Sequence, residues 1–201
     1  MDDSLFRYLR TSSLAPNDLE NFWIRVYLGS DSDLLSSSID RAYRDFSRTQ
    51  HGISKNDTPE RYALLKSKMR DIVQQLLEAK FETQAEFDDW HQCKCNYLID
   101  SYDELIGFKI SFGQAQKWIN MSLKYLYALG DARIPNISSN YQFFHVPIDN
   151  IIQEKLGMKL NGTCSRINTY DEYIAFQNKV RERFVGQIPM DVEFKLFNQL
   201  K

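Results

Sequence analysis

The sequence predicts an all-α protein, and three observations lead to that fold class. Apolar residues recur at three- and four-residue spacing along most of the chain, as they do on one face of an amphipathic helix. Eight glycines and five prolines among 201 residues leave little sequence for long loops. The best candidate for a β-strand, residues 141–146, is short.

Length and composition fit a single globular domain. A hydrophobic fraction of 43% and an aromatic fraction of 13% provide enough apolar material for a core. The whole chain has 25 basic and 27 acidic residues. Residues 105–201 hold 12 of the basic and 8 of the acidic residues, a net charge of +4. Residues 1–104 therefore hold 13 basic and 19 acidic residues, a net charge of −6. Asymmetry of this size is common. It also allows an alternative with an acidic N-terminal lobe (1–104), a site-bearing C-terminal lobe (105–201) and a cleft between them.

Eight stretches have helical periodicity. The predicted helices are residues 17–29, 31–52, 58–81, 83–107, 111–130, 147–157, 169–186 and 190–201. The first carries Leu19, Phe22, Trp23, Val26 and Tyr27 on one stripe, a pattern typical of a helix that packs against a core.

Capping residues and glycines predict the helix boundaries. Asn17 is the expected cap of the first helix. Thr58 followed by Pro59 begins the third, where proline suits the first helical position. Ser111 and Thr169 are the expected caps of the fifth and seventh helices. Glycines are expected to end three helices, at Gly52, Gly107 and Gly130.

Several broad classes of protein do not fit this sequence. A net charge of −2 is unlike that of a protein that coats nucleic acid non-specifically. The N-terminal MDDSLFRYLR lacks the apolar region of a signal peptide, and no stretch approaches the roughly 18 apolar residues of a membrane span. The odd number of cysteines, at positions 93, 95 and 164, fits reduced thiols, so we expect a cytoplasmic protein.

Two short motifs invite a chemical interpretation. In HQCKC only His91 and Cys95 share a helix face, so we expect no metal site there. In RDFSRTQH six residues separate Arg44 from His51. This spacing resembles the Arg-x(4–6)-His motif of the HEPN ribonucleases, all-helical dimers that act on an RNA phosphodiester, and it makes a ribonuclease one hypothesis. The simpler interpretation is that His51, beside Gly52, sits favourably at a helix C-terminus.

Lys117, in SFGQAQKW, and Asp149, in HVPID, are the main candidates for catalytic residues. A carboxylate at the start of a helix accepts backbone N–H groups and is held ionised. The simpler interpretation is that Asp149 is only a helix cap, worth about 1 kcal/mol. Lys117 would then be a solvated lysine at the polar edge of its helix.

Together these residues resemble the helix-hairpin-helix DNA glycosylases, and the archaeal 8-oxoguanine branch in particular. That family carries a lysine on one helix and, further on, an aspartate in a P-V-D or P-I-D motif. The similarity covers about residues 105–155, and the spacing of 32 between Lys117 and Asp149 fits that branch. The family's hairpin, L-P-G-x-G-x-K, is absent here: KISFGQAQK has one glycine, Gly113, where two are expected.

The resemblance implies a DNA glycosylase that needs no cofactor. Lys117 would attack C1′ of a flipped, damaged nucleoside, and a Schiff base would then permit strand cleavage. Asp149 would stabilise positive charge on the sugar. The residues expected to contact the base or a phosphate are Gln114, Trp118, Phe144 and His145, although the helix position of Trp118 also fits the core.

The missing hairpin supports a second hypothesis. A helical protein without chemistry would engage a partner protein or a nucleotide, for instance in phage defence or counter-defence. The two hypotheses can be separated by geometry, because the glycosylase requires the Lys117 amine and the Asp149 carboxylate to line one pocket. A separation above roughly 8 Å, with packed side chains between them, would exclude their cooperation.

Overall fold

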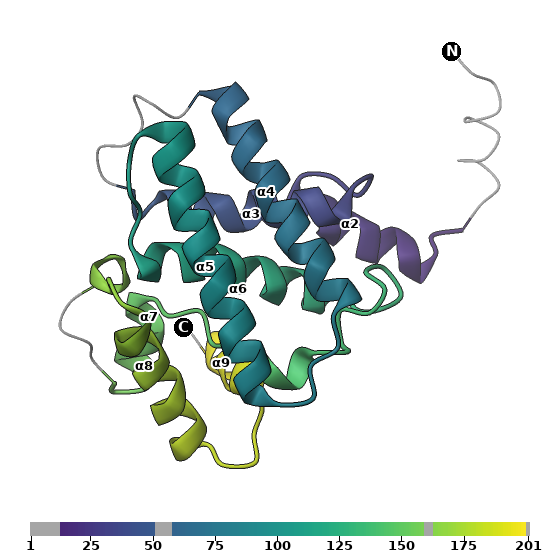
Figure 1. Ribbon diagram of the computed structural model, residues 1–201. Helices are drawn as coiled ribbons and strands as arrows, with labels where there is room; N and C mark the ends of the chain where they lie inside the picture. The colour runs from purple at the N-terminus through teal and green to yellow at the C-terminus, as the bar shows by residue number, and fades with distance from the viewer. Residues whose placement is uncertain (1–12, 51–57, 159–162, 200–201) are drawn as a thin grey trace.

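The computed structural model describes residues 13–50, 58–158 and 163–199 and has the predicted all-α class (Figure 1). The described residues form eight α-helices: α2 (Pro16–Leu28), α3 (Leu34–Ser47), α4 (Pro59–Glu78), α5 (Gln84–Ile106), α6 (Phe112–Leu129), α7 (Asn150–Lys155), α8 (Tyr170–Arg183) and α9 (Pro189–Phe197). Two 3₁₀-helices, η1 (Tyr141–Phe143) and η2 (Cys164–Arg166), lie in the connections. The strand candidate at 141–146 is η1 followed by extended chain, and no strand occurs in the described ranges. No helix in those ranges combines the length and apolarity needed to cross a bilayer.

Most predicted boundaries are confirmed because local side-chain caps set them. The side chains of Thr58, Thr83, Ser111 and Thr169 each accept a hydrogen bond from the backbone N–H three residues on. Several boundaries differ from the prediction: α4 ends at Glu78 rather than at 81, α7 spans Asn150–Lys155 rather than 147–157, and α8 ends at Arg183 rather than at 186. Helix α2 is preceded by Ala15 rather than capped by Asn17, because Pro16 takes the first helical position. Helix α3 ends at Ser47, well before Gly52, which lies outside the described residues.

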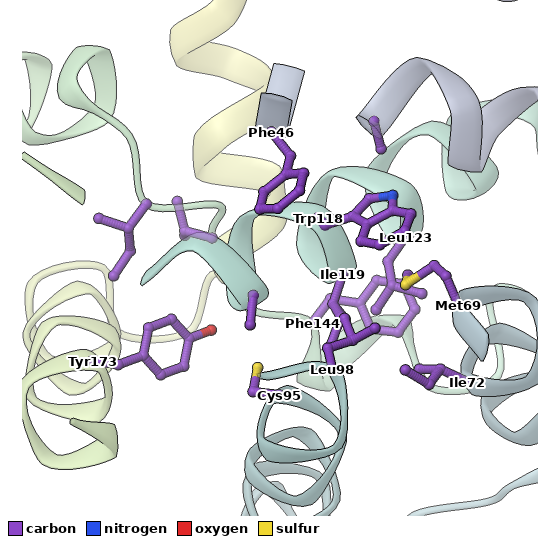
Figure 2. Packing of buried hydrophobic residues seen from close by; sticks show 14 of the residues in the cluster. Phe46, Met69, Ile72, Cys95, Leu98, Trp118, Ile119, Leu123, Phe144 and Tyr173 are labelled. Atoms are coloured by element: carbon purple, nitrogen blue, oxygen red, sulfur yellow. The ribbon is translucent and has the colours of Figure 1, made fainter. Parts of the chain in front are cut away.

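Helix α6 lies at the centre of the fold, where it packs most extensively against α3 and also contacts α5 and α8. Trp118 of α6 is fully buried, stacks on Phe46 of α3 with ring centroids 5.5 Å apart, and donates its indole N–H to Ile39 O at 3.2 Å (Figure 2). Residues from both sides of position 104 belong to one hydrophobic cluster, and position 104 itself lies inside α5. The described helices therefore share one core, without a division at that position.

Helix α2 packs on a different face from the one its apolar stripe predicts. Its buried residues are Ile24 and Leu28. The stripe itself is exposed: Leu19, Phe22, Trp23, Val26 and Tyr27 keep between 46% and 66% of their surface accessible. Periodicity identifies an apolar face but not the neighbour that covers it, and in the described chain this face points away from the core.

Candidate active site

Lys117 and Asp149 line the same pocket, although they come from different helices. Lys117 lies in the second turn of α6, and Asp149 immediately precedes α7. The pocket has a volume of about 530 Å³, and its other walls come from residues 48–49, 150–151 and 163–166. This volume is in the range of small-molecule and substrate pockets, roughly 300–1,000 Å³.

The two side chains differ in how they are held. Oδ1 of Asp149 accepts a hydrogen bond from Ile152 N–H at 2.8 Å, so the predicted role as a helix cap is confirmed. Lys117 makes no hydrogen bond or ion pair with the described residues. Cys164, in the same pocket, responds to both charges: burial raises the pKa of its thiol, Lys117 lowers it and Asp149 raises it. The charges of Lys117 and Asp149 are therefore both felt by a group inside the same pocket.

Two glutamine side chains hold the segment that leads to Asp149. Gln116 of α6 donates to Ile148 O at 3.1 Å and accepts from Ile148 N–H at 3.3 Å. Gln177 of α8 pairs in the same way with Val146, donating at 2.8 Å and accepting at 3.1 Å. The two amides pair with alternate residues of an extended segment, as a neighbouring strand would. They fix the chain one residue before the carboxylate.

A buried hydrogen-bond network continues from Gln116 toward the surface. Asn120 donates from Nδ2 to Gln116 Oε1 at 2.9 Å and to Tyr173 Oη at 3.0 Å. Because Tyr173 accepts there, we assign its own proton to the bond with His145 Nδ1 at 2.7 Å. His145 Nε2–H then donates to Asp88 Oδ1 at 2.7 Å. Each member has a partner, as buried polar groups require.

Opposite charges are paired where this network meets the surface. Arg181 donates to both carboxylate oxygens of Asp88, at 2.7 and 2.9 Å. Burial opposes ionisation of Asp88, but hydrogen bonds from His145 and Arg181 outweigh it and hold the pKa of that carboxyl well below its usual range. Burial lowers the pKa of His145 despite Asp88, and it lowers the pKa of the fully buried His91 still more. Both imidazoles are therefore neutral at pH 7, in agreement with the assigned tautomers.

The pocket is rich in positive charge. Arg48, Lys117 and Arg166 bring three cationic side chains to its walls against one carboxylate, Asp149. A neighbouring hollow of about 500 Å³ at the α5–α6 connection shares two lining residues with the pocket and adds Lys109. Cations grouped along a concave surface attract an anionic ligand.

Asp149 also lines a second, smaller cavity of about 70 Å³. Its apolar walls are Met121, Ile151, Ile152, Leu196 and Phe197. Lys124 and Glu193 form a buried ion pair of 2.5 Å in the same cavity. Glu193 Oε2 is buried without a hydrogen-bond partner in the described chain, which favours a ligand or an ordered water that donates to it. Burial raises the pKa of Glu193, although Lys124 opposes this effect.

The four residues expected to contact a base line neither cavity beside Asp149. Trp118 and Phe144 are fully buried, and a ring without an exposed face cannot stack on a ligand unless the core opens. His145 is fully buried within the network. Gln114 lines the neighbouring hollow, where it donates to Thr49 O at 2.9 Å. Closeness in sequence suggested all four, but consecutive residues point about 100° apart on helix α6 and to opposite sides in the extended chain that holds Phe144 and His145.

Gly113 is explained by packing inside the protein. A Cβ atom at this position would lie 1.8 Å from Cys164 O, and the Gly113 N–H donates to Ile167 O at 2.9 Å. The missing side chain lets residues 164–167, one wall of the pocket, approach the start of α6. The glycine that the resemblance assigned to a hairpin therefore has a structural role in this chain.

The remaining motifs lie away from the pocket. His91 and Cys95 contact each other at 3.7 Å inside the core, whereas Cys93 is exposed. No group of three metal-ligating side chains occurs in the described ranges. Arg44 is exposed on α3, and His51, its partner in the ribonuclease hypothesis, lies outside the described residues.

Comparisons with protein-family models, with curated proteins and with solved structures found no match for this chain. Function therefore has to be inferred from the geometry of the site and from the residues that compose it.

Proposed function

We propose that this chain is a DNA glycosylase with lyase activity, acting on a damaged base of the 8-oxoguanine type. The observation that carries the proposal is that Lys117, an amine without a partner in the described chain, lines one pocket with Asp149, a carboxylate fixed at a helix start. The proposed chemistry requires no cofactor, and its partner is duplex DNA. Three free thiols fit a cytoplasmic location.

In the proposed reaction the neutral amine of Lys117 attacks C1′ of the damaged nucleotide with its lone pair. The C1′–N bond breaks, and the base leaves with the bonding electrons and takes up a proton. Positive charge on the sugar is greatest in the transition state, where the carboxylate of Asp149 stabilises it. The C1′–O4′ bond then breaks, O4′ takes up a proton, and a Schiff base forms between Lys117 and C1′. Loss of a proton from C2′ then expels the 3′ phosphate, which cleaves the strand.

The two cavities that meet at Asp149 suit different parts of such a substrate. The cations of the larger pocket would hold phosphates on either side of a flipped nucleotide. The apolar cavity would take the base, with Met121 and Phe197 against its faces and Glu193 Oε2 accepting from its edge. A free volume of about 70 Å³ holds only a few water molecules. Binding a purine therefore requires Phe197, the half-exposed last residue of α9, to move outward.

Borohydride trapping tests the proposal. Labelled duplexes with one 8-oxoguanine or one abasic site would be incubated with wild type, Lys117→Gln and Lys109→Gln, the last a control for an amine in the adjoining hollow. We expect a covalent adduct from wild type and from Lys109→Gln on both duplexes, and none from Lys117→Gln. An abasic-site adduct that survives Lys117→Gln would identify a stray amine. No adduct with either duplex would rule out the lyase mechanism.

A second candidate, binding without chemistry, is favoured by one observation. Gly113, which the resemblance assigned to a DNA-binding hairpin, instead allows the backbone of Cys164 to pack closely against α6. A protein that binds a nucleotide predicts that fluorescence anisotropy detects association with a labelled nucleotide, while wild type yields no borohydride adduct with either duplex. Trapping that depends on Lys117 would exclude this candidate.

A further inference from the structure

The exposed apolar residues of the described chain are concentrated on α2 and just before it. Six of them lie within residues 14–27: Leu14, Leu19, Phe22, Trp23, Val26 and Tyr27. Elsewhere the described chain exposes large apolar residues mostly singly, as at Leu64, Tyr97 and Val185. Leu19, Phe22 and Val26 lie opposite Ile24 and Leu28, which face the core, whereas Tyr27 also packs against Tyr125 of α6. An apolar face gathered in this way is typical of an interaction surface.

We propose that this face, defined by Leu19, Phe22, Trp23 and Val26, binds the same face of a second copy of the chain. The two α2 helices run antiparallel in this contact. The proposal concerns assembly and is independent of the chemistry at Lys117.

The spacing of the face fits a helix pair. Leu19, Phe22 and Val26 follow each other at intervals of three and four, which is the spacing of a coiled-coil seam. If the twofold axis passes between residues 22 and 23, Phe22 of one copy lies opposite Trp23 of the other, and Leu19 lies opposite Val26. A twofold contact brings one patch against itself, so a single self-complementary face is sufficient.

The charges beside the face select the antiparallel direction. Asp18 and Arg25 lie on the same flank of α2, two turns apart. In an antiparallel pair each flank meets the same flank of the second copy, which places Asp18 beside the other copy's Arg25. In a parallel pair the flank with Asp18 and Arg25 would meet the other flank of the second copy, which would place Asp18 beside the second copy's Glu20. Arg25 is ion-paired with Asp31 at 2.8 Å through Nε and Nη2, but its side chain is 65% exposed, which leaves Nη1 to reach across.

The area of the face is consistent with a weak dimer. Taking about 150–250 Å² for each fully exposed aromatic residue, the exposed fractions give roughly 500 Å² per copy. Two copies would bury roughly 1,000 Å², the lower limit for a specific interface. We therefore expect dissociation at micromolar concentrations.

Sedimentation velocity of the full chain between about 1 and 200 µM tests the proposal. Wild type should shift from monomer to dimer across this range. Val26→Glu should stay monomeric, whereas Val185→Glu, which changes an exposed valine outside the face, should dimerise like wild type. Circular dichroism would verify that both variants are folded. A wild type that is monomeric throughout, as it would be if residues 1–12 or a different protein covered the face, overturns the proposal. Equal dimerisation of both variants does the same.

Oxidative cross-linking tests the direction of the pair. In a Cys93→Ser background, Phe22→Cys places two thiols close to the twofold axis, so a disulfide should form. Val26→Cys places them about 10 Å apart along the helices, so none should form. Cross-linking at both positions, or at position 26 alone, contradicts an antiparallel pair.

Discussion

Replacing Gln116 by methionine removes the amide that holds the chain before Asp149 and retains most of the side-chain volume. Four buried groups lose a partner: the N–H and C=O of Ile148, the C=O of Gly113 and one N–H of Asn120. Each unpaired group costs about 1–3 kcal/mol, so the free energy of unfolding should fall by at least about 3 kcal/mol. Gln177→Met removes a partner from only two groups, the N–H and C=O of Val146, and the C=O keeps a long bond from Asn120 at 3.5 Å, so this variant should cost less.

Urea unfolding at pH 7, with linear extrapolation to water, measures this loss as a shift of the midpoint at unchanged slope. Gln74→Met, on the exposed face of α4, is the matched control and should lie within about 0.5 kcal/mol of wild type. Hydrogen exchange at the Ile148 amide should also accelerate in Gln116→Met. A loss below about 1 kcal/mol, with unchanged exchange at Ile148, would refute the idea that Gln116 fixes this segment.

Three further variants or conditions test other parts of the structure. Gly113→Ala should cost about 1–3 kcal/mol or more, because the added Cβ meets the backbone oxygen of Cys164 at 1.8 Å; an unchanged melting temperature would contradict this close approach. Burial lowers the pKa of His91, so the stability it contributes is complete above about pH 6.5 and is lost as the pH falls below that value. Unfolding followed from pH 7 to 5 should therefore show a steeper decline in wild type than in His91→Gln. Glu193→Leu alone should cost about 3–5 kcal/mol by leaving Lys124 buried without its partner, whereas adding Lys124→Met should recover most of the loss in urea unfolding.

The helices could be predicted from the sequence because their signals are local. Thr58 and Ser111 cap their helices through contacts with residues three positions on, so no tertiary information is needed. The packing of α2 could not be predicted in this way. Its apolar stripe has the correct period, but only tertiary structure shows that Ile24 and Leu28 face the core while Trp23 faces outward.

The residues that line the pocket could be predicted only in part, for a related reason. The pocket joins Lys117 and Asp149 to Arg48 and Arg166, which no local motif connects with them. The role of Gln116 had a readable signal: it and Asn120 lie four residues apart, on one side of a helix rich in apolar residues, and buried amides need partners. The identity of those partners, the backbone at position 148 included, depends on how distant segments pack.

The charge of Asp149 allows binding and chemistry to be separated. A carboxylate in a pocket that only binds an anion repels its ligand, whereas in a glycosylase it stabilises the cationic sugar. Asp149→Asn keeps the oxygen that accepts from Ile152 N–H, and asparagine caps helices as well as aspartate does. Removing the repulsion, about 1 kcal/mol for charges near 4 Å in water, should tighten binding of an abasic-site duplex about fivefold in fluorescence anisotropy. Borohydride trapping should be lost in the same variant. If binding weakens, or if the adduct forms as in wild type, the carboxylate has no part in catalysis and its function is confined to capping α7.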